Sequence, residues 1–174
     1  MLWRHAKSSW SDPNCDDHDR PLNARGREAA PVMARWIVEN DLSPALILSS
    51  TSLRTRETIR PLMKLLPGHR APDFERGLYL ANEAALMKRI SAIPSAAKSA
   101  MIVGHNPGME DVCERLISTV TPEAQDANTF RQNKFPTAAC AVLSVEAERW
   151  RDGVETGFTL EKFVVPRDLM DVID

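Results

Sequence analysis

The sequence predicts an α/β fold in which a mostly parallel central sheet lies between two layers of helices, giving a three-layer α/β/α sandwich. Short apolar runs with β-branched residues alternate along the 174-residue chain with segments whose apolar residues recur at helical spacing. Strands separated by helices imply right-handed crossovers, and such crossovers join parallel strands. For the last two strands, an antiparallel arrangement is left open.

Five segments are predicted to be strands. A short first strand is expected at residues 1–3, and four longer apolar runs cover residues 44–49, 99–103, 138–143 and 158–165. The first two of these longer runs are expected to be buried on both faces, as is usual for strands of a parallel sheet. Because the first strand would be short, a natural start upstream of Met1 is left open.

Four segments have apolar residues at the spacing of an amphipathic helix. They are residues 30–38, residues 109–117, a stretch that begins near Ser52 and extends to Leu66, and a stretch that follows Asn82. Pro31 and Pro61 lie inside two of these patterns and are expected to kink the helices or delay their start.

The composition is that of one globular domain spanning residues 1–174. Hydrophobic residues make up 43% of the chain and charged residues 26%, a balance typical of a soluble protein that can bury a core without metals or disulfides. The formal net charge of -2 offers no general attraction to nucleic acid. No apolar run approaches the length of roughly 20 residues that a membrane span needs.

The three cysteines, Cys15, Cys113 and Cys140, are an odd number without a CxxC pair. This pattern favours neither a disulfide framework nor a zinc site. We therefore expect a cytoplasmic protein with no metal and no cofactor, and with no nucleic-acid or membrane partner.

Polar residues follow three of the predicted strands, at residues 4–8, 49–56 and 104–108. Because ligands bind at the carboxyl ends of the strands in an open parallel sheet, two histidines and several arginines are expected to meet at one edge. Arginine offers a planar fork of donors that matches phosphate oxygens, and a helix start adds free backbone N–H groups. The sequence therefore predicts a site for a phosphoryl group.

The two histidines at this edge, His5 and His105, suit phosphoryl transfer. One could attack phosphorus through a neutral ring nitrogen while the other, protonated, stabilises the charge on the phosphoryl oxygens. A single histidine at a strand end is more often structural, but a pair with an arginine-bearing segment between them favours a functional site. This chemistry requires neither a metal nor a cysteine.

Other phosphate chemistries fit the sequence less well. A cysteine-dependent phosphatase needs an arginine at a fixed distance after its cysteine, and the interval from Cys15 to Arg20 is too short. The glycine-rich pattern of a P-loop is absent from the chain. The acidic stretch from Asp16 to Asp19 lacks the ligand spacing of a calcium loop, so we interpret it as a solvated loop rather than a metal site.

Taken together, these motifs resemble the histidine phosphatase superfamily, and within it the small SixA-type phosphohistidine phosphatases. The resemblance runs nearly end to end. It is carried by the motifs Arg4-His5-Ala6-Lys7-Ser8, Asp19-Arg20-Pro21-Leu22 with Arg25-Gly26, Leu53-Arg54-Thr55-Arg56-Glu57-Thr58, Leu78-Tyr79-Leu80-Ala81, Val103-Gly104-His105-Asn106-Pro107-Gly108 and Phe135-Pro136-Thr137. An Arg-His pair alone would be weak, but its combination with the other motifs is specific.

The resemblance implies a phosphoglycerate mutase-like fold and a metal-independent phosphatase that removes phosphate from phosphohistidine on a partner protein. A histidine-containing phosphotransfer domain or carrier would be such a partner. His5 would be the nucleophile that forms a covalent phosphohistidine intermediate. Arg4 and Arg54 would hold phosphate oxygens, and His105 would be the second histidine of the pocket.

Four further residues are assigned by the same resemblance. Lys7 and Ser8 lie close enough to His5 to contribute to substrate binding, but Lys7 could equally be solvated. Asn106 is also expected to contribute to substrate binding. Arg56 is interpreted as a surface helix residue, because the family commonly has a non-basic residue there.

The proton donor for the leaving group is the main departure from the family. Asn106 stands where many relatives have an aspartate, and an amide cannot act as a general acid. An alkoxide leaving group needs that proton, whereas the imidazole of phosphohistidine can carry one before the P–N bond breaks. The departure therefore favours a phosphohistidine substrate, although Glu75 or Glu83 could reach the pocket as an acid.

Two other functions stay open at the level of sequence. One is a phosphatase or mutase of small phosphorylated metabolites, and the other is a regulatory module that binds phosphate without turnover. The connections between the predicted strands are short and leave little room for a lid, which suits a side chain on a protein surface.

Overall fold

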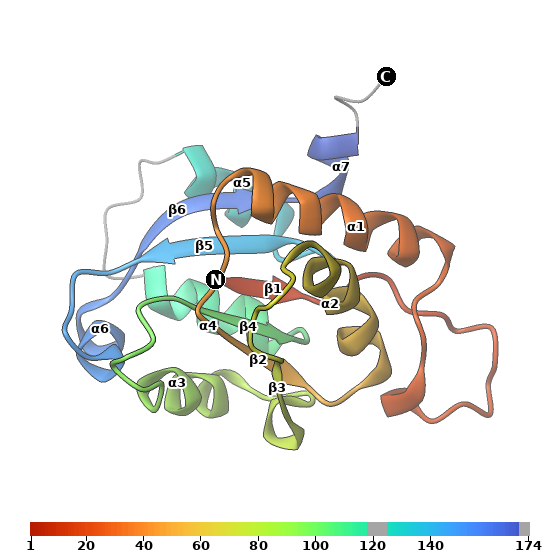
Figure 1. Cartoon of the computed structure of the whole chain (residues 1–174), viewed down its shortest axis with the longest axis horizontal. Coiled ribbons are helices and arrows are strands. Elements are labelled where there is room, and N and C mark those ends of the chain that lie inside the picture. The colour runs from red at the N-terminus through yellow and green to blue at the C-terminus, as the bar shows by residue number, and fades with distance from the viewer. Residues whose placement is uncertain (118–124, 171–174) are drawn as a thin grey trace.

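The central sheet has six strands in the order β3-β2-β4-β1-β5-β6 (Figure 1). A computed structural model describes residues 1–117 and 125–170 of the chain. The strands are β1 (Leu2–Arg4), β2 (Leu46–Ser50), β3 (Asp73–Glu75), β4 (Ala100–Gly104), β5 (Cys140–Ser144) and β6 (Thr159–Val164). All five predicted strands are present, and β3 is additional.

The sheet is mostly parallel, as predicted. β1 pairs with β4, β4 with β2, and β2 with β3, all in parallel. β5 runs antiparallel to both β1 and β6, so the last two strands are antiparallel to each other. The consequence for function is that β1, β2 and β4 end at the same edge of the sheet.

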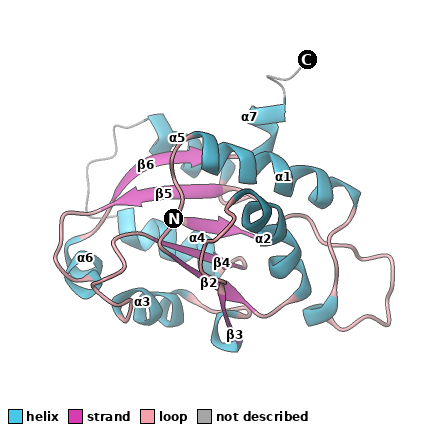
Figure 2. Cartoon of the chain, in the orientation of Figure 1, coloured by secondary structure: helices cyan, strands magenta, loops and turns pink. Residues whose placement is uncertain are grey.

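Helices cover both faces of the sheet, which confirms the three-layer α/β/α architecture (Figure 2). The fold is phosphoglycerate mutase-like. The α-helices are α1 (Ala24–Glu39), α2 (Leu53–Leu65), α3 (Glu83–Ser91), α4 (Gly108–Ile117), α5 (Gln125–Asn133), α6 (Trp150–Thr156) and α7 (Pro166–Met170). Two short 3-10 helices, η1 (Asp17–Asp19) and η2 (Arg76–Leu78), lie in the connections after β1 and β3.

Two apolar clusters fill the spaces between the sheet and the two helix layers. In one cluster, Ile47 and Met101 of the sheet pack with residues of α1 and α2, such as Met33. In the other, Leu48 and Ile102 pack with residues of α3, α4 and α5. Neighbouring residues of β2 and β4 thus point into opposite clusters, and both strands are buried along their whole length. The prediction of burial on both faces is confirmed.

The two prolines do not act as expected on helix boundaries. Pro31 lies inside α1, which already begins at Ala24, and Pro61 lies inside α2. In α1 the apolar residues on both sides of the proline, including Ala30 before it and Met33 after it, are buried. Packing of this face against the sheet therefore outweighs the backbone hydrogen bond that a proline cannot donate.

Within the described ranges, no helix combines the length and the apolar character that crossing a membrane would require.

Candidate active site

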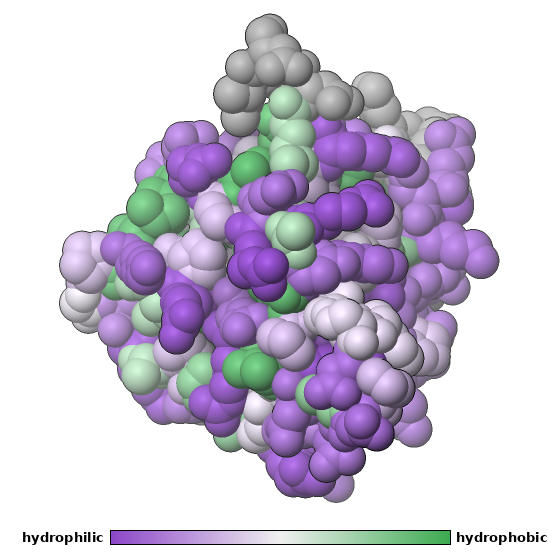
Figure 3. Space-filling view, turned by 90° about the vertical axis from the view of Figure 1, so that its right-hand side faces the viewer, coloured by the Kyte–Doolittle hydropathy of each residue, from purple (hydrophilic) through white to green (hydrophobic). Residues whose placement is uncertain are grey.

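The three polar segments that follow β1, β2 and β4 meet at one edge of the sheet. His5 follows β1, His105 follows β4, and Arg54 lies in the first turn of α2, just after β2. The ring centroids of His5 and His105 are 5.0 Å apart. Figure 3 views the side toward which β1 and β4 point in Figure 1, and this side is mostly hydrophilic with scattered hydrophobic residues. The predicted convergence of the two histidines is confirmed.

His5 is fixed by its backbone as well as by its ring. Its N–H donates to the carbonyl of Gly104 (3.1 Å), and its carbonyl accepts from the N–H of Ala138 (3.0 Å). Its Nδ1 lies 2.8 Å from the carbonyl oxygen of Ala6. A carbonyl can only accept, so this contact assigns the proton to Nδ1 and leaves the Nε2 lone pair free. Burial lowers the pKa of His5 to about 4, which keeps the ring neutral and nucleophilic at neutral pH.

His105 is almost completely buried and is held between Arg54 and Ser50. Arg54 Nη2 lies 3.3 Å from Nδ1, and the Oγ of Ser50 lies 2.8 Å from Nε2. Because a guanidinium only donates, Nδ1 accepts and Nε2–H donates to Ser50. Burial, followed by the charges of His5 and Arg54, lowers the pKa of His105 to about 3. The ring is therefore neutral in the ligand-free site. The expected protonated form concerns the site with a phosphoryl group bound, where the dianion would raise this pKa, and it stays a prediction.

Arg54 is buried and already holds an internal anion. Its Nη1 donates to the backbone carbonyl of Asp17, and its Nη2 donates to Oδ2 of the same residue (2.9 Å). The hydroxyl of Tyr79 donates to this oxygen as well (2.6 Å). Although partial burial acts to raise it, the hydrogen bonds from Tyr79 and Arg54 lower the pKa of Asp17 overall. An ionised carboxylate thus lies beside the two histidines.

The interpretation of residues 16–19 as a simple solvated loop is therefore wrong for Asp17. The residue belongs to η1, which returns toward the sheet and contacts α2 through Arg54. Sequence reasoning missed this role because nothing local distinguishes Asp17 from the acidic residues around it. The metal reading of the loop gains no support, since the described residues contain no group of three or more side chains placed to hold a metal ion.

Tyr79 is the second residue that sequence reasoning left without a role, although it lies in a quoted motif. Its ring stands edge-on to His105, with centroids 5.4 Å apart. The turn that carries it lies against the start of α4: a Cβ on Gly108 would be 1.9 Å from the carbonyl oxygen of Ala81. Only glycine permits this approach, which brings Tyr79 and His105 together.

Arg4 reaches the same pocket from β1. Its Nη1 donates to the carbonyl of Phe135 (2.6 Å), and its charge lowers the pKa of both His5 and His105. Its Nε is buried and has no hydrogen-bond partner among the described residues. One donor of Arg4 is therefore unpaired within the described ranges, and its expected contact with phosphate stays a prediction.

The three expected binding residues differ in position. Asn106 lies at the pocket, where its Nδ2 donates to Glu110 (2.9 Å) and to the carbonyl of Phe135 (3.2 Å), the same carbonyl that Arg4 contacts. Ser8 is buried and forms an isolated bridge with Leu22. The side chain of Lys7 is exposed. Asn106 thus shares a backbone carbonyl with Arg4, whereas Lys7 and Ser8 make no such contact in the described structure.

Neither glutamate considered as a general acid contacts the two histidines in the part of the chain that the structure describes. Glu75 forms a two-pronged ion pair with Arg89, with distances of 2.8 Å. Glu83 lies 3.9 Å from Arg115. Both carboxylates are directed toward arginines of the α3 and α4 region rather than toward His5.

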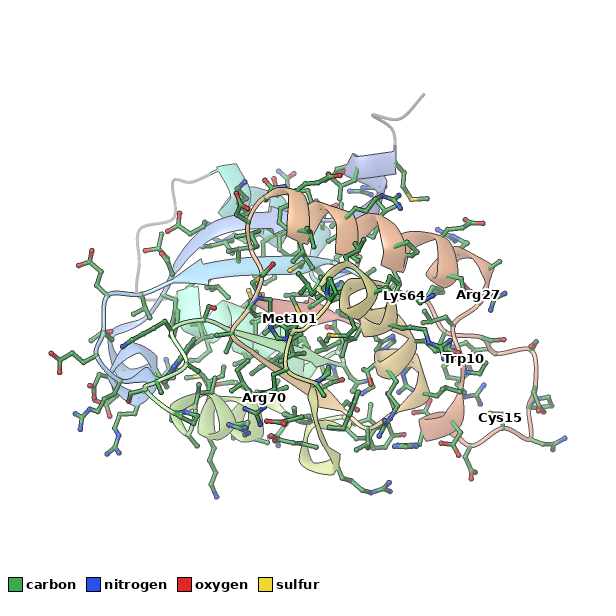
Figure 4. All side chains as sticks on the ribbon, in the orientation of Figure 1. Trp10, Cys15, Arg27, Lys64, Arg70 and Met101 are labelled. Carbon is green, nitrogen blue, oxygen red and sulfur yellow. The ribbon has the colours of Figure 1, made fainter. Side chains whose placement is uncertain are left out.

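The cysteines lie away from this chemistry. Burial raises the pKa of Cys113 and of Cys140 to about 12, so both are protonated thiols at neutral pH and poor nucleophiles. Figure 4 shows Cys15 on the loop that projects from the side of the molecule, away from the sheet. The structure therefore gives no cysteine a role beside His5.

Comparisons with known proteins match most of the chain. A model of the histidine phosphatase superfamily (branch 1) matches residues 1–77. An uncharacterized protein of Mycobacterium leprae is 35% identical over 168 residues, which cover 94% of this chain and 99% of the relative.

Two solved structures assigned as phosphohistidine phosphatase SixA are also similar. The one from Agrobacterium tumefaciens is 31% identical with a TM-score of 0.77, and the match covers 95% of this chain and 96% of that one. The one from Nakamurella multipartitia is 26% identical with a TM-score of 0.77, and covers 95% of each chain.

Proposed function

The chain belongs to the histidine phosphatase superfamily, and from this membership we propose that it hydrolyses phosphohistidine on a partner protein through a covalent intermediate on His5. The observation that carries the proposal is the placement of two buried, neutral histidines 5.0 Å apart beside Arg54. We also infer that the protein acts in the cytoplasm and needs no metal or cofactor for this reaction.

In the first step, the lone pair on Nε2 of His5 attacks phosphorus. The P–N bond of the substrate breaks, and its electron pair returns to the imidazole of the substrate, which leaves neutral if its other nitrogen carries a proton. His5 then carries the phosphoryl group on Nε2 and keeps its proton on Nδ1, where the carbonyl of Ala6 accepts it. The intermediate is a cationic imidazolium, which is a good leaving group for the next step.

In the second step, water attacks phosphorus and the bond to Nε2 breaks. The electron pair returns to Nε2, and the proton lost by water stays with the released phosphate. Arg54 and Arg4 would bind the phosphoryl oxygens in both steps, because planar guanidinium groups match two oxygens at once. His105 would gain a proton as the dianion binds, and would then donate a charged hydrogen bond to a phosphoryl oxygen.

The choice of phosphohistidine as substrate is supported by the protonation state of the site. Asn106 cannot donate a proton to a leaving group, Glu75 is bound by Arg89, and the Asp17 carboxylate is ionised. An alkoxide would leave from such a site slowly, since general acid catalysis commonly contributes a factor of about 10² to 10⁴. The two similar SixA structures carry the name of phosphohistidine phosphatases, which supports the same choice.

A protein substrate is supported by the surface near the site. Trp10 follows the first motif and is 70% exposed, with the guanidinium of Arg20 4.1 Å from its ring centroid. Figure 4 places Trp10 on the side toward which β1 points. Exposed tryptophan and arginine side chains are enriched where proteins bind one another. A phosphotransfer domain or phosphohistidine-bearing carrier would suit this surface.

The proposal is tested by labelling and by substrate choice. Incubation with a ³²P-labelled phosphohistidine protein should place an acid-labile label on the wild-type chain, and none on the His5→Ala variant. Release of phosphate should be faster from phosphohistidine than from sugar or nucleotide phosphates. Faster turnover of the small phosphate esters would support a metabolite phosphatase instead, and binding of phosphate without label or turnover would support a regulatory module.

A further inference from the structure

A cavity lies at the same edge of the sheet as the catalytic centre and takes no part in the proposed chemistry. It has a volume of about 360 Å³ and is lined by His18, Asp19, Thr51, Leu53, Arg56 and Arg76. Thr51 follows β2 directly, and Leu53 is the first residue of α2. The cavity therefore lies at the same edge of the sheet as Arg54.

Arg56 enters this cavity in a fixed position. Its Nε donates to the backbone carbonyl of Thr51 (2.9 Å), and its guanidinium lies 4.0 Å from the ring centroid of Phe74. These two contacts hold the plane of the guanidinium. No hydrogen bond from either Nη atom is present within the described ranges, so the paired donors of the fork stay available to a ligand.

Arg76 gives the cavity a second positive charge. It is exposed on η2 and forms no ion pair with the residues that the structure describes. The acidic residues of the neighbouring strand do not neutralise it, because Asp73 pairs with Arg70 and Glu75 pairs with Arg89. The one carboxylate on the cavity wall, Asp19, contacts Nδ1 of His18 (2.7 Å).

The rings of His18 and Tyr79 lie between the cavity and the catalytic centre. His18 Nε2 lies 2.9 Å from the Oγ1 of Thr51, and the ring centroid of His18 is 5.0 Å from that of Tyr79. Tyr79 in turn packs against His105. A substrate whose phosphoryl group lies at His5 could therefore place a neighbouring side chain in the cavity.

We propose that Arg56 and Arg76 form an anion subsite that binds a carboxylate side chain of the substrate protein, near its phosphohistidine. The inference rests on the proposed function and deepens it, because it assigns a partner with acidic residues around the modified histidine. A guanidinium fork that is already oriented loses little conformational freedom when it binds a carboxylate. The subsite would act on substrate binding and not on the chemical step.

The test uses two synthetic phosphohistidine peptides that differ only at the residues flanking the phosphohistidine, which are aspartate and glutamate in one peptide and asparagine and glutamine in the other. The wild-type chain should have a KM about three- to tenfold lower for the acidic peptide, at equal kcat, as two exposed ion pairs would give. This preference should disappear in the double variant Arg56→Gln/Arg76→Gln, and it should shrink as salt is raised from low to moderate concentration.

The matched control is Arg60→Gln, which removes an exposed arginine of the same helix that does not line the cavity. It should keep the preference for the acidic peptide. Free phosphohistidine, which has no flanking residues, should be hydrolysed equally by the wild type and by both variants. Equal KM values for the two peptides in the wild type, or a preference that survives in the double variant, would overturn the subsite.

A binding measurement distinguishes failure of the anion subsite from failure of the proposed function. If none of the phosphohistidine substrates is hydrolysed, the proposed function fails, and the unphosphorylated peptides still test the subsite by fluorescence anisotropy. Tighter binding of the acidic peptide to the wild type than to the double variant would then support the subsite. Equal binding to the two proteins would overturn it.

Discussion

The two ends of the parallel strands hold cavities of similar volume and different chemistry. At the carboxyl end, the cavity of about 360 Å³ lies at the same edge of the sheet as two buried histidines and a buried arginine. At the amino end, a cavity of about 380 Å³ is walled mainly by apolar side chains, among them Ile93, Trp150 and Phe158. The volumes alone would not tell the two ends apart. The histidine pair does, because it combines two lowered pKa values with a buried arginine, and perturbed pKa values cluster at functional sites. At the amino end, burial also lowers the pKa of the Met1 amino group, but no histidine of the described residues lines that cavity.

This difference indicates that activity depends on the carboxyl end of the strands and stability on the amino end. Burial of neutral histidines at the carboxyl end opposes folding once the unfolded chain can bind protons. Burial of Phe158 and its neighbours at the amino end stabilises the fold through apolar contact. Substitutions at the two ends should therefore be separable: those at the carboxyl end should change turnover, and those at the amino end should change stability.

The largest effect is expected from His5→Ala. Removal of the nucleophile should lower kcat by at least about 10⁴-fold, while the protein stays folded at neutral pH. The measurement is phosphate release from a phosphohistidine protein, together with a thermal unfolding curve. His69→Ala is the matched control, because within the described residues the ring of His69 bonds to the carbonyls of Arg70 and Pro44 alone. Comparable losses in the two variants would contradict the assignment of His5.

Arg54→Lys should have the next largest effect on activity. Lysine keeps the charge but loses the fork that contacts both His105 and Asp17, so kcat/KM should fall by about 10² to 10³. Steady-state kinetics on the same substrate measures this, with Arg60→Lys as the control on the same helix. Activity within about threefold of the wild type would mean that charge alone is sufficient at this position.

At the other end of the strands, Phe158→Ala should change stability and leave the chemistry intact. Phe158 is buried, and truncation of a buried phenylalanine costs about 3 to 5 kcal/mol in the free energy of unfolding. Urea unfolding gives this value, and kcat measured on the folded fraction should equal that of the wild type. A loss of kcat in the folded protein would break the division between the two ends.

Low pH should destabilise the protein through protonation of the two histidines at the carboxyl end of the strands. The pKa of His5 is about 4 and that of His105 about 3 in the folded protein, below the usual value near 6.5. Between these values and pH 6.5 the unfolded chain binds more protons, so the free energy of unfolding should fall as the pH is lowered through this window. For His5 alone the fall would be roughly 3 kcal/mol near pH 4.

The pH effect is measured by urea unfolding at pH 7, 5.5 and 4. His5→Gln removes one of the two titrating rings, so the variant should lose less stability than the wild type over this range. Parallel pH profiles for the two proteins would argue that His5 is not held neutral by burial.

The smallest effects are expected from Glu75→Gln and Glu83→Gln. Both glutamates are paired with arginines away from the histidines, so activity on phosphohistidine and on an alkyl phosphate should stay within about twofold of the wild type. A large loss on both substrates from either change would identify that glutamate as the missing general acid. It would also remove the physical reason for preferring a phosphohistidine substrate.

Much of the fold was predictable because its strands and helices carry strong patterns. β2 begins with an apolar run and β4 is apolar throughout, and α1 and α4 have apolar residues at helical spacing. β3 was not predictable, since it has only three residues and two of them are acidic. α5 was missed because its sequence, QDANTFRQN, is polar and lacks an apolar stripe. Such elements form through contacts with the rest of the chain rather than through local preference.

Part of the candidate site was predictable from the sequence, and part was not. The convergence of His5, Arg54 and His105 was predictable, because the ends of neighbouring parallel strands share an edge. The contact of Asp17 with Arg54 was not, since it joins residues 37 positions apart through a loop without periodicity. The neutral state of His105 was also beyond the sequence, because it depends on the burial of the ring and on the charges packed around it.

The backbone hydrogen bonds of His5 to Gly104 and Ala138 place the proposed nucleophile within the hydrogen-bonded frame of the sheet. A residue held on both sides cannot carry a phosphoryl group from one place to another. The phosphohistidine substrate and water must therefore react at Nε2 of His5 one after the other. The dephosphorylated substrate has to leave before water can take its place. Kinetics of the double-displacement type would follow, and a second imidazole that reached the site ahead of water would receive the phosphoryl group in its place.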